Sequence, residues 1–154
     1  MIRIDWTQLC EMAFLDDSAR LCMIGIMTHF PAPQLPVAMR QVVIVVRIVD
    51  VEAEESFSIG VSMLTPRGAL LTPQSSDGFD ITVTAEYIFI TLRDIPLKEE
   101  GMHRFSVAVG KGDPVPIDVS VRLVVSRAPA GGNLDHNASR PFGQASWVAS
   151  REVN

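Results

Sequence analysis

The sequence predicts a soluble, single-domain, all-β sandwich. Three observations support this fold class. Apolar and polar residues alternate with a period of two in several segments, as in strands with one face in a core and one in water. Turn sequences separate these segments at the spacing typical of a sandwich or barrel. No segment shows the long apolar period of 3.6 residues that a helical domain requires.

The clearest alternation predicts a hairpin near the end of the domain. From 115 to 125 every odd position is apolar, and most even positions are polar. The segment 104–109 alternates in the same way, with its odd positions facing inward. The glycine-rich stretch 110–114 has the composition of a hairpin loop, so we expect it to connect the two strands.

Four further segments are expected to be strands in the middle of the chain. The segment 57–63 alternates up to a strong turn signal, and 69–72 is its expected short partner. The segment 37–49 is apolar at both odd and even positions, which predicts a long inner strand. The segment 80–92 begins with alternation and then becomes apolar on both faces, which indicates either a bulge or a central strand covered on both sides.

The first thirty residues are open to two interpretations. Helical spacing of apolar residues and a capping-box pair favour a helix over 7–15. An acidic turn at 16–19 and a strand-like segment at 21–28 favour a hairpin instead, and we adopt the strand for 7–15. The three prolines of 29–36 predict a loop. The chain then has about eight strands in all.

The two cysteines, Cys10 and Cys22, are expected to be free thiols. A hairpin that turns at 16–19 pairs Cys10 with a residue near Gly25. The two thiols then lie about four positions out of register, or roughly 13 Å apart at ~3.3 Å per residue. A disulfide needs Cα atoms within about 7 Å. Reduced, mostly buried thiols fit a reducing compartment.

Charge and hydropathy exclude several classes of partner. The formal net charge of −5 argues against a dedicated nucleic-acid binder and against docking on an anionic membrane. Asp5 and Glu11 interrupt any secretion signal. The most apolar run, 42–49, contains Arg47 and is far shorter than the roughly 20 residues of a spanning helix. We therefore expect a cytoplasmic protein without nucleic-acid or membrane partners.

Three stretches of the chain resemble a group of small bacterial proteins of unknown function. They are LCEMA at 9–13 before the acidic turn, LTPRGALL at 64–71, and GMHRFSV at 101–107. The resemblance covers about residues 7–125. It implies an immunoglobulin-like antiparallel β-sandwich of about eight strands. It implies no activity, substrate or catalytic residue.

No pattern indicates a catalytic, metal-binding or cofactor-binding residue. His29, His103 and His136 have no further ligand at zinc spacing, so we expect ordinary surface histidines. The nucleophile elbow Gly-x-Ser-x-Gly is not present, and the acidic loops match no calcium-binding spacing. We predict a protein that is not an enzyme and needs no cofactor.

The last segment, 127–154, is expected to be a flexible polar tail that follows a sandwich domain at 1–126. Phe142 and Trp147 stand out in it as candidate anchors for a protein partner or a second copy, since aromatic anchors dominate interface energies. Two alternatives stay open: the rings pack on their own sandwich, or the tail has no function.

The predicted function is a non-enzymatic protein-interaction or structural module. A sandwich offers sheet edges and loops for binding, and the sequence supplies no nucleophile, metal site or cofactor cradle. A small-ligand or carbohydrate-binding sandwich is the alternative, and an enzyme is a more remote one. The partner and the biological process are not encoded in any motif.

Overall fold

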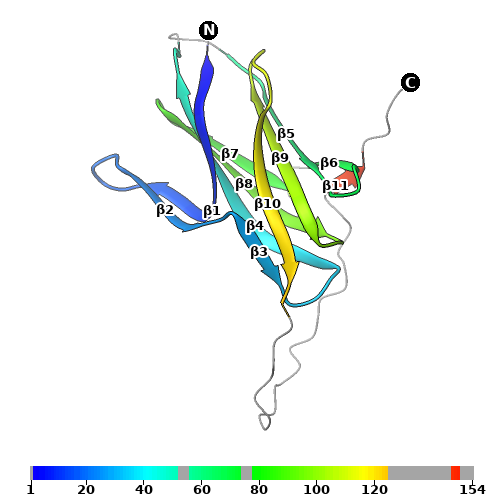
Figure 1. Ribbon diagram of the computed structural model, residues 1–154. Helices are drawn as coiled ribbons and strands as arrows, with labels where there is room; N and C mark the ends of the chain where they lie inside the picture. The colour runs from blue at the N-terminus through cyan, green and yellow to red at the C-terminus, as the bar shows by residue number, and fades with distance from the viewer. Residues whose placement is uncertain (1, 52–55, 74–77, 125–146, 150–154) are drawn as a thin grey trace.

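Two β-sheets pack face to face in the computed structural model (Figure 1), which describes residues 2–51, 56–73, 78–124 and 147–149. Within these ranges the fold is all-β, and eleven strands follow one another along the chain. They are β1 (Arg3–Leu15), β2 (Leu21–Ile26), β3 (His29–Ala32), β4 (Val37–Val49), β5 (Ile59–Leu64), β6 (Leu70–Pro73), β7 (Phe79–Val83), β8 (Tyr87–Leu97), β9 (Gly101–Val109), β10 (Val115–Leu123) and β11 (Trp147–Ala149).

The strand order defines the two sheets. Sheet A has the order β2-β1-β4-β8-β7, and sheet B has the order β11-β6-β5-β9-β10-β3. All neighbours are antiparallel except β3 and β10, which run parallel. The main core lies between the sheets, because the inward-facing residues of both sheets belong to one buried cluster. It includes Ile44 and Ile90 from sheet A and Phe105 and Val119 from sheet B.

The strand expected at 7–15 is confirmed as part of β1, so the helical alternative is wrong. β1 and β2 form an antiparallel hairpin around the acidic turn. The Asp16 carboxylate accepts hydrogen bonds from the backbone N–H groups of Ser18 and Arg20 and pairs with the Arg20 guanidinium at 2.7 Å. These local bonds favour the turn over a helix that would continue through it.

The hairpin register places the cysteines as expected. Cys10 lies opposite Ile26 and Cys22 lies opposite Phe14, so the two thiols are four positions out of register. Both cysteines are free. Burial raises the pKa of the Cys10 thiol, whereas Cys22 is only half-buried. Cys10 therefore acts as a small apolar residue of the packing.

The expected loop at 29–36 is wrong in its first half, because His29–Ala32 forms β3. This strand lies at the edge of sheet B beside β10, and the backbone N–H of Val124 donates to the carbonyl of Ala32. Pro31 has no N–H to donate, but an edge strand tolerates this because one side of it needs no partner. Proline content alone therefore does not separate an edge strand from a loop.

The single strand expected at 80–92 is two strands, β7 and β8, joined by a tight turn. The Thr84 hydroxyl donates to the carbonyl of Tyr87 and accepts from its N–H, both at 2.9 Å. The change in the apolar pattern therefore marks this turn. Within β8 the expectation of a central strand covered on both sides is confirmed, since β8 lies between β4 and β7 and its residues 88–90 are buried.

One histidine lies inside the core, which corrects the expectation of a surface residue. His103 is 1% exposed, and it shares the inward face of β9 with Phe105 and Val107. Its Nδ1 donates to the carbonyl of Gly101 at 3.3 Å, while its Nε2 has no hydrogen-bond partner among the described residues. Burial lowers the pKa of the imidazole, although the bond to Gly101 and the charge of Glu99 oppose this shift.

The facing of β10 predicts the effect of a buried charge. Val119→Asp should lower the free energy of unfolding by about 3 kcal/mol or more, because it buries an unpaired carboxylate between the sheets. Ser120→Asp, on the opposite face, should stay within about 1 kcal/mol of the parent. Urea unfolding of both variants measures the difference. Equal midpoints would contradict the facing of β10.

The buried imidazole predicts a loss of stability in mild acid. The pKa of His103 is lower in the folded chain than the unfolded value of about 6.5, so the unfolded state takes up the proton first. The stabilising contribution is complete above about pH 6.5 and decreases as the pH falls below it. His103→Leu should flatten the decrease in unfolding free energy between pH 7.5 and 5.

Denaturant titrations at several pH values measure how the free energy of unfolding changes between pH 7.5 and 5. The pKa values of Asp16 and Asp118 are also lowered, chiefly by hydrogen bonds from Arg20 and Arg104. Both shifts move the titration of these carboxyls further away from the chosen interval. A slope that persists unchanged in the His103→Leu protein would mean that another group is responsible.

Candidate functional site

The hairpin of β1 and β2 leaves sheet A, and we call its residues 11–26 the arm. β1 pairs with β4 only as far as the opposed residues Cys10 and Val43, whereas its pairing with β2 continues to Leu15 and Leu21. Beyond Cys10, β1 therefore lies beside β2 alone. The arm projects from the body of the molecule at the left of Figure 1.

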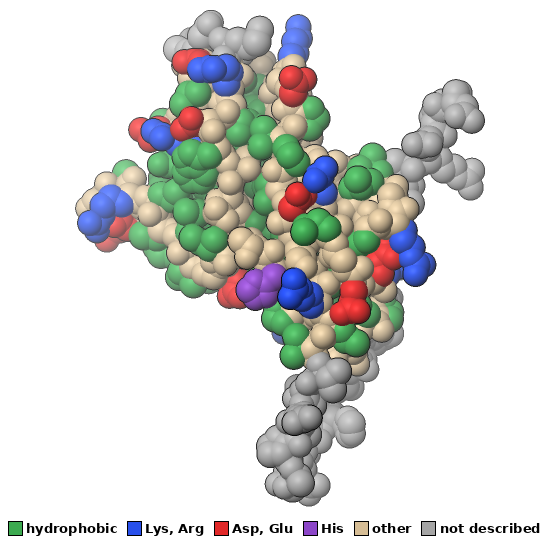
Figure 2. All heavy atoms as spheres, in the orientation of Figure 1, with side chains coloured by type: hydrophobic (Ala, Val, Ile, Leu, Met, Phe, Trp, Pro, Cys, Tyr) green, Lys and Arg blue, Asp and Glu red, His purple; other side chains and the backbone are tan. Residues whose placement is uncertain are grey.

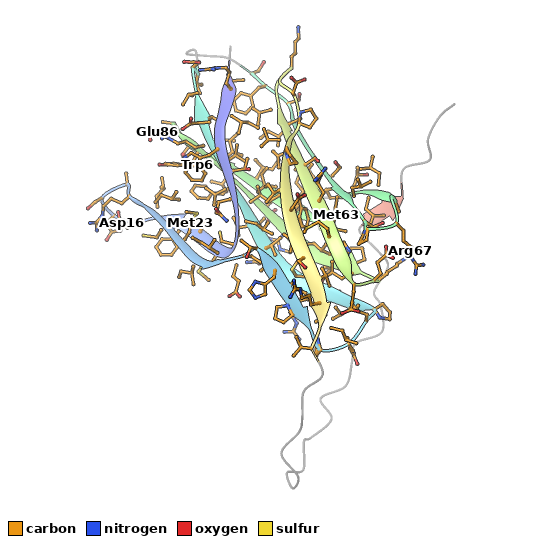
Figure 3. The ribbon with its side chains drawn as sticks, in the orientation of Figure 1. Trp6, Asp16, Met23, Met63, Arg67 and Glu86 are labelled. Carbon is orange, nitrogen blue, oxygen red and sulfur yellow. The ribbon has the colours of Figure 1, made fainter. Side chains whose placement is uncertain are left out.

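The inner side of the arm packs on the outer surface of sheet A. A small buried cluster lies there, separate from the main core, and consists of Cys10, Val43, Val45 and Phe89. Four arm residues pack against this cluster: Ala13, Leu15, Leu21 and Met23. Figure 3 shows Met23 and Trp6 on the side of the molecule from which the arm projects. The arm is thus anchored by one of its two faces.

Aromatic rings complete this outer cluster. Trp6 and Tyr87 are half-buried beside it, with ring centroids 6.2 Å apart, and Tyr87 is 6.2 Å from Phe89. Phe89 is buried. The three rings therefore pack in tilted pairs within the protein, at interplanar angles of 55° and 38°, and do not form an open platform for a sugar ring.

The other side of the arm is apolar and open to solvent. We call its four large residues the arm face: Met12, Phe14, Ile24 and Ile26. Their exposed fractions lie between 43% and 59%. Met12 lies directly opposite Ile24, and the other two are two positions away along each strand, so all four share one face. Figure 2 shows hydrophobic side chains along the arm and charged ones at its tip.

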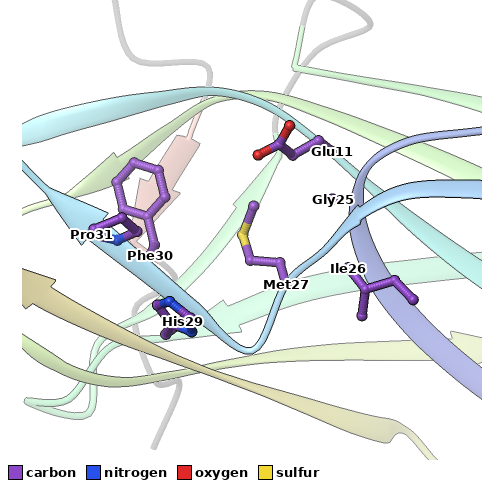
Figure 4. Close-up of a pocket in the computed structure, with 7 residues that line it drawn as sticks. All are labelled: Glu11, Gly25, Ile26, Met27, His29, Phe30 and Pro31. Atoms are coloured by element: carbon purple, nitrogen blue, oxygen red, sulfur yellow. The ribbon is translucent and has the colours of Figure 1, made fainter.

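A hollow of about 300 Å³ adjoins the arm face where the chain passes from β2 to β3. Figure 4 shows its lining: Glu11, Gly25, Ile26, Met27, His29, Phe30 and Pro31. Gly25 has a φ of +66°, and an added Cβ would lie 2.7 Å from the Glu11 side chain. Only glycine therefore allows Glu11 to lie across β2 at the mouth of the hollow.

The chemistry of the hollow is mostly apolar with one carboxylate. Glu11 and His29 lie on opposite sides of the hollow with Met27 between them (Figure 4). Glu11 has no cationic partner among the described residues. No group of three His, Cys, Asp or Glu residues in the described ranges is arranged to hold a metal ion. The hollow therefore has mostly apolar walls and one carboxylate, that of Glu11.

Of the two residues expected from the sequence to be anchors, one lies in the part of the chain that the structure describes. Phe142 lies outside the described residues. Trp147 begins β11, whose backbone pairs with β6 at the edge of sheet B, far along the strand order from the arm. The strand β11 itself is a feature that the polar composition around it did not indicate.

The arm face was missed by the strand assignments, although a signal for it exists. Residues 9–15 and 21–26 are apolar at both odd and even positions. A two-stranded hairpin with two apolar faces needs cover on both faces, and the protein covers only one. An excess of apolar residues in a hairpin is therefore the pattern that could have indicated an open surface.

Comparison with known proteins places the chain in a family. Across the described ranges, no helix is long and apolar enough to cross a membrane. No curated protein matches the chain. A family model described as a family of unknown function (DUF6941) matches residues 5–122, a span that includes the arm, the hollow and both sheets up to β10. The chain therefore belongs to this family of unknown function, DUF6941.

Proposed function

We propose that this chain is a non-enzymatic protein-interaction module that binds a polypeptide partner on the arm face and the adjoining hollow. One observation carries the proposal: four large apolar side chains remain about half exposed on a hairpin whose opposite face is anchored. Apolar surface in water costs about 25 cal/mol per Å², so a contiguous patch of this kind marks a binding surface.

The chemistry of the surface defines the class of partner. The arm face requires apolar side chains, and Ile26 links it to the hollow, which has room for one of them. Glu11 lies at the hollow without a described cationic partner, so a Lys or Arg of the partner would complete the contact. We therefore propose a polypeptide with apolar anchors next to a basic residue. The net charge of −5 supports a basic partner segment.

The finer fold class is part of the proposal. The order β1-β4-β8-β7 in sheet A corresponds to strands A, B, E and D of an immunoglobulin-like domain. The order β6-β5-β9-β10 in sheet B corresponds to C′, C, F and G. This correspondence supports an immunoglobulin-like sandwich in which β2 is an added strand. The arm is then an insertion beside strand A, outside the conserved framework of such domains.

The location and the tail anchors are also proposals. Two free cysteines and the acidic net charge support a reducing, cytoplasmic location without nucleic-acid partners. Phe142 and Trp147 remain predicted anchors for a partner or a second copy. Trp147 begins β11 at the edge of sheet B, so it would act from the other sheet than the arm face.

The experiment compares two equally exposed apolar positions. Ile24 on the arm face is 52% exposed, and Val83 on β7, at the opposite edge of sheet A, is 50% exposed. A partner isolated with the wild-type chain from the native host is purified, and its affinity for each variant is measured by calorimetry. Ile24→Lys should weaken binding about 10-fold to 100-fold, as expected for the loss of one apolar anchor. Val83→Lys should not change it.

A third variant tests the carboxylate. Glu11→Gln should weaken binding severalfold and reduce its dependence on salt, because one charge pair is lost. Equal affinities of the wild type and Ile24→Lys would contradict the arm face as the binding surface. A wild-type chain that retains no partner from the native host would contradict the proposal as a whole.

A further inference from the structure

The outer edge of sheet B accepts a strand from a distant part of the chain. β6 pairs with β5 at only two positions, Leu70 with Leu64 and Leu71 with Met63. The other side of β6 is covered by β11, which runs antiparallel to it and pairs through Leu71, Thr72 and Pro73. An extended segment that completes an open sheet edge is the geometry of β-strand addition. Figure 1 shows β11 beside β6, away from the arm.

The segment that connects β10 to β11 is long enough for β11 to reach either its own β6 or the β6 of a second copy of the chain. The 22 residues 125–146 separate β11 from the described end of β10. A chain of that length reaches at most roughly 75 Å at ~3.3–3.6 Å per residue. This reach exceeds the distance of about 5 Å between neighbouring strands many times over. The same segment is therefore long enough to meet the β6 edge of a second molecule.

The pairing of β11 with β6 is short enough to exchange. It extends over three residue pairs, and Pro73 in one of them has no backbone N–H to donate. A strand held by so few backbone bonds is marginal by itself. Release and re-pairing of β11 break only these few backbone pairings with β6.

Other edges of the two sheets carry features that interrupt pairing. The β3 edge contains Pro31, and the β2 edge contains Gly25 with its positive φ and the Glu11 side chain across it. The β7 edge carries Asp80 in an ion pair with Arg93. Prolines, irregular backbone and charges are the usual protections of edge strands. The β6 edge is protected by a strand instead, which shows that it can accept one.

We propose that the β6 edge is a strand-acceptor site for residues 147–149 of a second copy of this chain, so that two copies exchange β11 reciprocally. The second copy is the favoured donor because it carries residues 147–149, which pair with this edge in the described part of the chain. Reciprocal exchange keeps every backbone pairing of β6 with β11 and closes a two-fold symmetric dimer.

The exchange depends on protein concentration. The tether holds β11 near its own β6 at an effective concentration of roughly millimolar order. The monomer with β11 on its own edge therefore dominates in dilute solution, and the exchanged dimer increases with concentration. This association is independent of the arm face, which lies on the other sheet, so Ile24→Lys leaves it unchanged.

A complementation experiment with full-length chains tests the site. Val148→Pro makes the donor strand unable to pair, and Thr72→Pro blocks the opposed position of the acceptor edge. Neither variant can form the exchanged dimer alone. In a mixture, the β11 of the Thr72→Pro chain is free to take the intact β6 edge of the Val148→Pro chain. Sedimentation should show a one-to-one heterodimer, with association at least about ten-fold tighter than the self-association of either variant.

A peptide provides a second measurement, in case Thr72→Pro is poorly folded. A synthetic peptide of residues 143–154 should bind the Val148→Pro chain and should bind the wild-type chain at least about ten-fold more weakly, because the wild-type edge is occupied. A matched peptide with proline at position 148 should not bind. A mixture that stays monomeric, together with no binding of the peptide, would overturn the proposal. Dimerisation of the wild type and both variants with equal affinity would also overturn it.

Discussion

The centre of sheet A is apolar on both faces, and the rest of the architecture depends on this property. Ile44 and Ile90 face the main core, whereas Val43, Val45 and Phe89 on the same two strands face the other way. A sheet with two apolar faces needs cover on both sides, since each buried aliphatic side chain contributes about 1.5–3 kcal/mol. Sheet B covers one face. The arm covers the other, which explains why β1 leaves the sheet beyond Cys10.

The exposed arm face follows from the same requirement. The arm must be apolar on its inner side to cover Val43 and Val45, and its strands are too thin to bury a second face of their own. Polar residues on the outer side would suffice for solubility, yet Met12, Phe14, Ile24 and Ile26 occupy it. The fold alone does not require these four exposed apolar side chains. An interaction with another polypeptide is the physical reason that we propose for them.

The sequence predicts a strand well where one face of the strand is exposed to solvent, and less well where both faces are covered. The alternation of 104–109 and 115–125 gives both the strands and their facing, and His103 lies one step before that pattern on its inward parity. The change in periodicity at Thr84 was interpreted as a bulge or a central strand, because the pattern does not reveal the local hydroxyl bonds that make it a turn. The strand β3 was missed because an edge position leaves no mark in hydrophobic periodicity. The candidate surface was missed for a related reason. Which face of an apolar hairpin is covered depends on tertiary packing, here on residues of β4 and β8.

Two separate apolar clusters hold different parts of the protein in place. The arm is fastened by the small cluster around Val45 and Phe89, whereas the two sheets are fastened by the much larger cluster between them. Local opening of the arm therefore requires less free energy than global unfolding, and the arm amides should exchange with deuterium through this smaller opening. Opening of the arm would also uncover Cys10, whose thiol is otherwise fully buried. The reactivity of that one thiol thus reports how often the arm is detached while the sheets stay folded.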